Sequence, residues 1–291
     1  MPVPPECGDT RPDYAAARKS STIRACKAAL HGAGVAWKAA AGLRFGMDAD
    51  LRLLEELTLS TWPALANLYR DGWVIRLSGG HTGRANSVTV LAPGREPVEA
   101  KVGHAEAIYA RAGLVPLFRM TPLAEPGLAP LLDAHGYDVH KTSHVMVTDS
   151  LPDRADGSVR LCNRQDSAWN RGYAEMSGLS QNAARLQERI QSAIALPCLY
   201  AKAIVEDRVA AVALAVIDRG WAGIFEVATH PDFRGRGLAG RVVQAALAGA
   251  RRRGAEKGFL QVQADNARAI PIYERLGFRR LYDYHYRKPT A

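Results

Sequence analysis

Glycine and arginine alternate at the point where a strand pattern gives way to a helix pattern. Arg234-Gly235-Arg236-Gly237-Leu238-Ala239 follows an apolar stretch that ends at Thr229, and the apolar residues from Leu238 onward recur at helical spacing. Glycines let a backbone approach a ligand closely, and the N–H groups at a helix start suit a phosphate or pyrophosphate. The segment predicts an anion-binding loop, although an ordinary strand-to-helix turn with two exposed arginines fits the same residues.

Neither a nicotinamide site nor a Walker loop is predicted here. Gly235, Gly237 and Gly240 have the spacing of the dinucleotide fingerprint, but five residues separate Thr229 from Gly235. That fingerprint needs a tight turn directly after its strand and an acid about 20 residues further on, at the end of the next strand. A Walker loop would need Gly-Lys-Ser/Thr, which does not follow.

A second motif runs from Asn266 to Phe278. Asp265 or Asn266 can cap a helix there, and Gly277 can end it. The positions that would share one face of this helix are Ala269, Ile272, Tyr273 and Leu276. Taken alone, Tyr273 fits a core residue on a packed helix.

Together the two motifs resemble those of the GNAT superfamily of N-acetyltransferases. The family's acyl-CoA loop, Gln/Arg-x-x-Gly-x-Gly/Ala, is matched by residues 234–239, and its later block by Asn266, Ala269, Tyr273, Gly277 and Phe278. The resemblance covers residues 159–288. It implies the fold class α/β (α+β), with a GNAT-type mixed, splayed β-sheet flanked by helices and the pantetheine arm of acyl-CoA in the gap.

The resemblance also implies a role for each matching residue. Val227, Ala228 and Thr229 would bond the pantetheine as an added strand would, and the Val227 amide would polarise the thioester carbonyl. Asn266 would hold the CoA arm, and Tyr273 would protonate the departing thiolate. The backbone amides that would hold the CoA pyrophosphate are those of Arg234, Gly235, Arg236, Gly237, Leu238 and Ala239.

Glu226 is the only carboxylate on the strand that would lie beside the reacting thioester. An alkyl amine with a lysine-like pKa of about 10.4 must lose a proton before it can attack at neutral pH. We therefore expect Glu226 to act as general base, directly or through water. The alternative is an ordinary polar residue on a half-exposed strand.

These roles predict a transferase that moves acetyl from acetyl-CoA to a primary amine in a ternary complex, without a metal. The alternative is a non-catalytic acyl-CoA-binding or scaffold protein that keeps the fold without turnover. The presence of both Glu226 and Tyr273 favours the enzyme. By analogy with the family, we expect residues 173–186 and 283–285 to flank the acceptor site.

The chain divides into three expected parts. Residues 1–46 have seven basic and three acidic residues and little strand pattern, which indicates a poorly ordered basic extension. Residues 47–150 alternate helix and strand patterns, and residues 149–157 form a polar linker with Pro and Gly. Residues 158–291 are the expected catalytic domain.

The first half resembles the family more weakly. Residues 108–114 (IYARAGL) match residues 272–278 (IYERLGF), which suggests two GNAT-like halves, although convergent helix–Gly–strand chemistry would give the same match. Trp73 precedes Tyr109 by 36 positions (109 − 73), against 44 (273 − 229) from Thr229 to Tyr273. We therefore expect a degenerate half with no acyl-CoA loop and no room for one, and we interpret the glycine-rich residues 78–84 as a connection between strands.

Composition and charge bear on the class of protein, its location and its partners. The 291 residues are 47% hydrophobic and 23% charged, typical of a globular chain, and the net charge is +9. Neither an apolar run of about 18 residues nor a signal peptide is visible, and the four cysteines form no CxxC pair. We expect a cytoplasmic monomer or homodimer whose partner is a small-molecule or peptide amine, with no nucleic acid or membrane.

Overall fold

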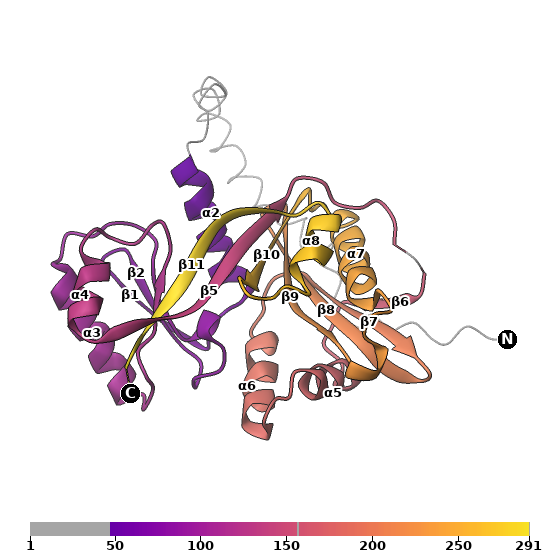
Figure 1. Ribbon diagram of the computed structural model, residues 1–291, viewed down its shortest axis with the longest axis horizontal. Coiled ribbons are helices and arrows are strands. Elements are labelled where there is room, and N and C mark those ends of the chain that lie inside the picture. Colours follow the sequence, from indigo (N-terminus) through magenta and orange to yellow (C-terminus); the bar gives the residue numbers. More distant parts are fainter. Residues whose placement is uncertain (1–46, 156, 291) are drawn as a thin grey trace, which may run out of the picture. The chain divides into compact units, whose positions relative to one another are not determined.

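The computed structural model describes residues 47–155 and 157–290 (Figure 1). The basic extension predicted for residues 1–46 lies outside these residues. Within these described residues, eleven strands form one sheet in the order β1-β2-β3-β4-β11-β5-β10-β9-β8-β7-β6. No helix of the described ranges is long and apolar enough to cross a membrane.

The elements alternate along the chain as the sequence predicts. The first half contains α2 (Met47–Thr61), β1 (Ala66–Arg70), β2 (Trp73–Leu77), η3 (Gly83–Ala85), β3 (Val88–Val90), α3 (Val98–Arg111), β4 (Phe118–Met120), α4 (Leu128–Ala134) and β5 (Tyr137–Thr148). The second contains β6 (Val159–Cys162), α5 (Ser167–Met176), α6 (Gln181–Ser192), β7 (Cys198–Val205), β8 (Arg208–Asp218), β9 (Trp221–Thr229), η4 (Pro231–Phe233), α7 (Leu238–Arg251), β10 (Lys257–Gln263), α8 (Ile270–Arg275) and β11 (Arg279–Pro289).

Two of the first-half strands are short or exposed. Within residues 114–120 only Phe118–Met120 form a strand, and Pro116 has no N–H to give to a ladder. The strand β1 was not predicted, because most of it is exposed and it has no alternating apolar pattern.

The sheet has an approximate twofold order about its two central strands, β5 and β11, which lie side by side and antiparallel. On one side β5 pairs with β10, and β10 runs parallel to β9. On the other side β11 pairs with β4, and β4 runs parallel to β3. The expectation of two related halves is confirmed, and each half places its last strand in the sheet of the other (Figure 1).

This strand order shows that the two matching sequence segments do not occupy equivalent positions in the two halves. Residues 108–114 end α3, whose counterpart is α7, whereas residues 272–278 end α8, whose counterpart is α4. Both segments end a helix with a left-handed glycine, Gly113 at φ 67° and Gly277 at φ 84°. That is a general way to stop a helix, so the match reflects convergent helix-end chemistry rather than equivalent positions.

Apolar side chains fill both faces of the sheet in the second half. The helix α7 packs on β7, β8 and β9. Its buried side chains include those of Val242, Val243, Ala246 and Leu247. On the opposite face, α5 packs on β8 and β9, and the fully buried Trp169 of this helix donates from Nε1 to Ala201 O. The strands that carry the predicted site are therefore held between two packed layers.

Candidate active site

The sheet opens between β9 and β10. These parallel strands pair only from Trp221–Lys257 to Ile224–Leu260, although β9 continues to Thr229 and β10 to Gln263. Beyond Ile224 the described residues contain no pairing between them. One edge of β9 therefore offers backbone groups to a ligand in this stretch.

The direction of these backbone groups follows from the ladder with β8. His230 donates its N–H to Ala210 O at 2.9 Å, and consecutive residues of an antiparallel strand face alternate sides. Ala228 therefore faces β8, where it lies opposite Val212. Thr229 and Val227 direct their N–H and C=O groups toward the opening, where an added extended chain would bond them.

A β-bulge in β9 holds Glu226. The register with β8 shifts between Phe225 and Ala228, and Glu226 has a φ of 52°, a left-handed conformation that costs energy for a residue with a side chain. The Glu226 side chain is only 2% exposed. It is thus a buried carboxylate in a strained backbone, and not the half-exposed polar residue that the sequence allowed as an alternative.

The environment of Glu226 acts on its pKa in two directions. Burial raises the pKa of this carboxyl, because a charge is poorly solvated there, whereas the Arg84 guanidinium beside it acts to lower it. Arg84 Nη2 lies 2.7 Å from Glu226 Oε1. The net shift is upward, toward the range in which a carboxylate can accept a proton from an ammonium group.

Tyr273 of α8 lies 8% exposed, with its ring packed edge-on against Phe278 at a centroid distance of 6.2 Å. Burial raises the pKa of Tyr273 to about 12, and the charge of Arg84 acts in the opposite direction. Its hydroxyl therefore keeps its proton at neutral pH and can donate it. The Arg84 charge therefore acts on both predicted catalytic residues, Tyr273 and Glu226.

The predicted anion loop forms an uncapped helix start. Gly235 and Gly237 have φ values of 78° and 72°, which L-residues rarely adopt. Gly237 is the N-cap of α7, no side chain among the described residues caps this helix, and its first turn contains no acid. The backbone N–H groups of Leu238, Ala239 and their neighbours are thus available for an anion.

Further observations fit a ligand in the opening. The Thr229 hydroxyl is buried and has no hydrogen-bond partner among the described residues. Asn266 lies in the turn before α8, where its side chain accepts a hydrogen bond from Ala269 N at 3.1 Å; the N-cap of α8 itself is Ala269, not Asp265 or Asn266 as predicted. Within the described residues no group of three or more metal-ligating side chains comes together.

The first half has a counterpart of the anion loop, contrary to the expectation that it lacks room for one. Residues 91–97 join β3 to α3, as residues 230–237 join β9 to α7. The expectation was wrong because it set Tyr109 opposite Tyr273, which occupy non-equivalent helices. The counterpart has Pro97, which carries no N–H, at the position of Gly237.

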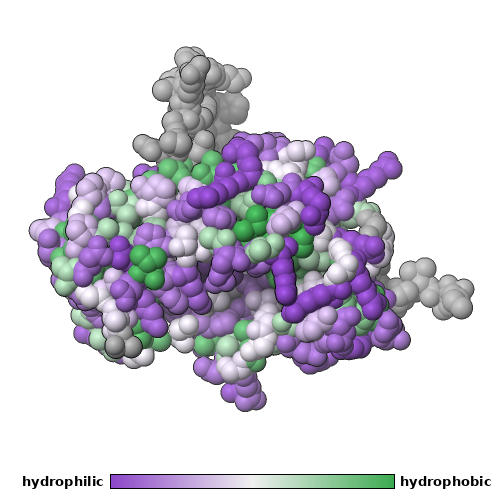
Figure 2. Space-filling model, in the orientation of Figure 1, coloured by the Kyte–Doolittle hydropathy of each residue, from purple (hydrophilic) through white to green (hydrophobic). Residues whose placement is uncertain are grey.

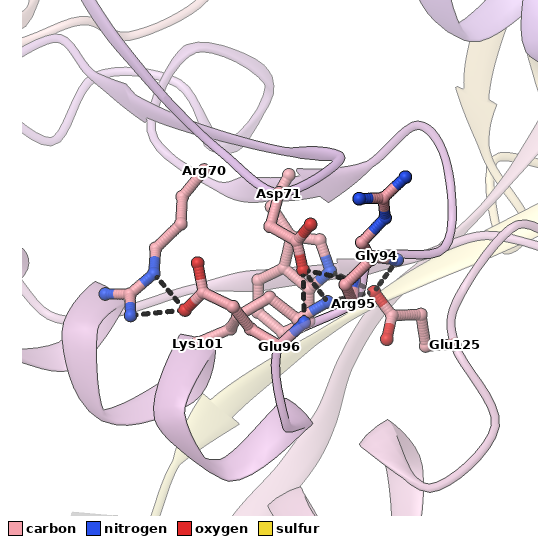
Figure 3. A network of polar contacts seen from close by, with 8 residues as sticks. Arg70, Asp71, Gly94, Arg95, Glu96, Lys101 and Glu125 are labelled. Carbon is pink, nitrogen blue, oxygen red and sulfur yellow. Dashed lines mark hydrogen bonds and ion pairs between the residues drawn. The ribbon is translucent and has the colours of Figure 1, made fainter.

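Carboxylates of the chain itself occupy this counterpart loop (Figure 3). Asp71 Oδ2 accepts hydrogen bonds from Arg95 N at 2.6 Å and Glu96 N at 2.7 Å. Glu125 accepts from Gly94 N, and the buried Lys101 pairs with both Asp71 and Glu125. The N–H groups of Gly94, Arg95 and Glu96 are thus bound to side chains of the protein, although no side chain of the described residues caps α3 itself.

Sequence reasoning missed the residues that the first half contributes to this site. Arg84, expected in a connection between strands, contacts Glu226, and its guanidinium lies over the rings of Trp62 and Phe225. The two rings stack with centroids 5.4 Å apart. No local spacing links residues so distant in sequence, so only the tertiary structure shows this contact.

Solved structures share this fold. A GCN5-related N-acetyltransferase from Kribbella flavida superposes with a TM-score of 0.62 at 16% identity, covering 83% of this chain and 96% of that chain. A tandem GNAT protein from the clavulanic acid biosynthesis pathway superposes with a TM-score of 0.56 at 14% identity, covering 82% and 89%. The splayed sheet in two halves is therefore the GNAT fold.

The family can be stated more narrowly. The model of a family described as "Probable histone acetyltransferase Rv0428c C-terminal" matches residues 48–287, so the chain belongs to that family. An uncharacterized N-acetyltransferase YobR of Bacillus subtilis is 26% identical over 245 residues, covering 82% of this chain and 98% of the relative. The probable histone acetyltransferase Rv0428c of Mycobacterium tuberculosis is 29% identical over 237 residues, covering 79% and 71%.

Proposed function

We propose that this protein transfers acetyl from acetyl-CoA to a primary amine. The observation that carries the proposal is the open edge of β9 ahead of the uncapped, glycine-led start of α7. An extended pantetheine arm suits the first feature and a pyrophosphate suits the second. The family and its N-acetyltransferase relatives support the same reaction.

The reaction divides into steps that the site residues can assist. Glu226 takes a proton from the bound ammonium group, and the freed nitrogen lone pair attacks the thioester carbonyl carbon. The Val227 N–H, which faces the opening, donates a hydrogen bond to the developing oxyanion. The C–S bond then breaks, Tyr273 supplies a proton to the departing sulfur, and the second proton that the nitrogen loses passes to the Tyr273 oxygen, which leaves the neutral amide and CoA as products.

The acceptor would enter beside α6. An open groove of about 630 Å³ is lined by Leu65, by Arg185, Glu188, Arg189 and Ser192 of α6, and by Ala193 just after that helix. Figure 2 shows the surface hollowed above α6, with mostly hydrophilic residues around the hollow. The expectation that residues 173–186 and 283–285 flank the acceptor stays a prediction, as does the choice between a small molecule and a peptide.

A thiol-release assay tests the function directly. The protein is incubated with acetyl-CoA and, in turn, with polyamines, aminoglycosides, amino acids and peptides with free N-termini. Amine-dependent release of CoA supports the enzyme. Acetyl-CoA binding without release for any amine would instead favour the non-catalytic alternative, and calorimetry with acetyl-CoA separates that case from a chain that does not bind it.

We expect one acetyl-CoA to bind per chain. The loop of residues 91–97 already bonds Asp71 and Glu125, whereas in the loop of residues 234–239 Arg234 N donates to Pro231 O and no side chain of the described residues caps the helix start at Gly237. Isothermal titration calorimetry with acetyl-CoA gives the stoichiometry. A value of two would show that the carboxylates in the first half do not exclude the cosubstrate.

Replacing Gly237 with alanine should weaken acetyl-CoA binding roughly 5–30-fold, because the left-handed conformation costs a residue with a side chain about 1–2 kcal/mol. A Cβ at Gly237 would meet no atom of the described residues within 4 Å, so strain rather than collision is the cause.

Gly254, just beyond the other end of α7, has a φ of 88° and equally open surroundings among the described residues. Gly254→Ala is therefore the matched control, since it should lower the melting temperature similarly without changing the affinity. If both variants bind acetyl-CoA as tightly as the unaltered protein, the loop conformation does not determine binding.

A further inference from the structure

One cation from the first half reaches the buried carboxylate of the second. Arg84 lies in η3, and its Nη2 is 2.7 Å from Glu226 Oε1, although 142 residues separate them. The Arg84 side chain is 19% exposed and that of Glu226 is 2% exposed. A charge pair this well buried is weakly screened, so the charge of Arg84 acts on the ionisation of Glu226.

Arg84 is fixed at both ends. Its guanidinium lies 4.9 Å from the ring centroid of Trp62 and 5.4 Å from that of Phe225. Its backbone carbonyl accepts a hydrogen bond from Nη1 of the buried Arg76 at 2.6 Å. Arg76 also donates to Leu59 O and Trp62 O, which ties the end of α2 to the same position.

The loop that carries Arg84 is held as a unit. Asn86 Oδ1 accepts from Ser78 N at 2.6 Å and Gly80 N at 2.9 Å, and Asn86 Nδ2 donates to His81 O and Thr82 O. His81 Nε2 lies 2.8 Å from Oε1 of the buried Gln187, which belongs to α6. The loop is therefore anchored in the first half and to a helix of the second, and it is more than a connection between strands.

We propose that Arg84 is a positioning residue for Glu226, so that the first half supplies the counter-charge that keeps the catalytic base ionised and oriented. The proposal rests on the function proposed above. It gives the first half a chemical role, because a half without a free anion loop still completes the site of the other. Arg84 acts through Glu226 and needs no contact with acetyl-CoA or the amine.

Other titratable groups act on the same pair. His81 lies in the same loop as Arg84, and it acts to lower the pKa of Glu226 in the same direction as Arg84. Tyr273 of α8, Tyr286 of β11 and Arg76 of β2 lie within electrostatic reach of Arg84. A His81→Gln variant therefore accompanies the test, to separate the imidazole from the guanidinium.

Two substitutions at Arg84 separate charge from packing. Arg84→Met keeps apolar contact with Trp62 and Phe225 but removes the charge, and Arg84→Lys restores it. Arg287 of β11 is a control arginine, because its side chain is 14% exposed and its Nη1 lies 2.6 Å from Asp133 Oδ1 of α4. Arg287→Met removes an arginine–carboxylate pair away from Glu226, at a carboxylate that is itself exposed.

The first measurement needs no acceptor. An infrared pH titration follows the carbonyl stretch of protonated Glu226, assigned by its absence in Glu226→Gln. In Arg84→Met this band should persist to higher pH than in the unaltered protein, and in Arg84→Lys it should largely return. Arg287→Met should leave it unchanged. If Arg84→Met and the unaltered protein titrate at the same pH, the proposal is overturned.

The second measurement uses the amine that the thiol-release panel identifies. Arg84→Met should lower kcat about tenfold or more at neutral pH, the effect of losing a counter-charge at contact distance, and activity should recover as the pH rises. The affinity for acetyl-CoA should stay the same. If no amine reacts with the unaltered protein, the proposed function fails, while the infrared titration still decides whether Arg84 controls Glu226.

Discussion

Tyr273→Phe should slow acetyl transfer by roughly 10²–10⁴-fold while acetyl-CoA binds with nearly unchanged affinity. The loss corresponds to about 3–5 kcal/mol of transition-state stabilisation, which is the contribution of a positioned acid. The variant deletes one hydroxyl from a buried ring whose packing against Phe278 remains. Because the hydroxyl meets the sulfur only as the C–S bond breaks, the effect belongs to kcat rather than to binding.

The pH dependence makes this prediction sharper. Burial raises the pKa of Tyr273 to about 12, so the donor remains protonated throughout the neutral and moderately alkaline range. The Tyr273→Phe defect should therefore be constant over that range, unlike a defect in a base.

Tyr137→Phe is the matched control. Its hydroxyl donates to Glu106 Oε1 at 2.8 Å, in the first half, and its removal should leave kcat unchanged. Single-turnover rates are the appropriate readout, because slow product release can hide a change in the chemical step. An unchanged single-turnover rate in Tyr273→Phe would remove this residue from the mechanism.

The parts of the site that depend on neighbouring residues could be predicted from the sequence. Gly235 and Gly237 were identified by their residue type and spacing, and both have positive φ values in the structure. Asn266 caps the turn that it precedes. These features arise within a few residues of chain, where glycine conformation and side-chain capping dominate. The halves of the chain were also recognisable, since each alternates strand and helix patterns.

What could not be predicted depends on contacts between distant segments. The exchange of β5 and β11 between the halves leaves no trace in local periodicity, because a strand has the same pattern whichever strand lies beside it. The bulge at Glu226 is set by packing against β8, and the Arg84 contact spans the two halves. The match between residues 108–114 and 272–278 gave a wrong alignment of the two halves, because helices that are not equivalent can end in similar residues.

Glu226→Gln should lower kcat at pH 7 by roughly 10²–10⁴-fold, because the variant keeps the shape and one hydrogen-bonding oxygen but cannot accept the proton of the ammonium group. Burial makes the net shift of the Glu226 pKa upward, so the unaltered enzyme should lose activity as the pH falls through that raised pKa. The variant should lack this inflection. Its activity should rise toward pH 10, where a growing share of the amine is already neutral.

Glu55→Gln is the matched control for the stability cost of this change. Glu55 is buried and pairs with the buried Arg119, so its replacement also leaves a guanidinium without its carboxylate. Both variants should melt at lower temperature, but kcat per folded molecule should fall only in Glu226→Gln. Equal losses of kcat in the two variants would mean that the fold, and not proton transfer, requires the carboxylate of Glu226.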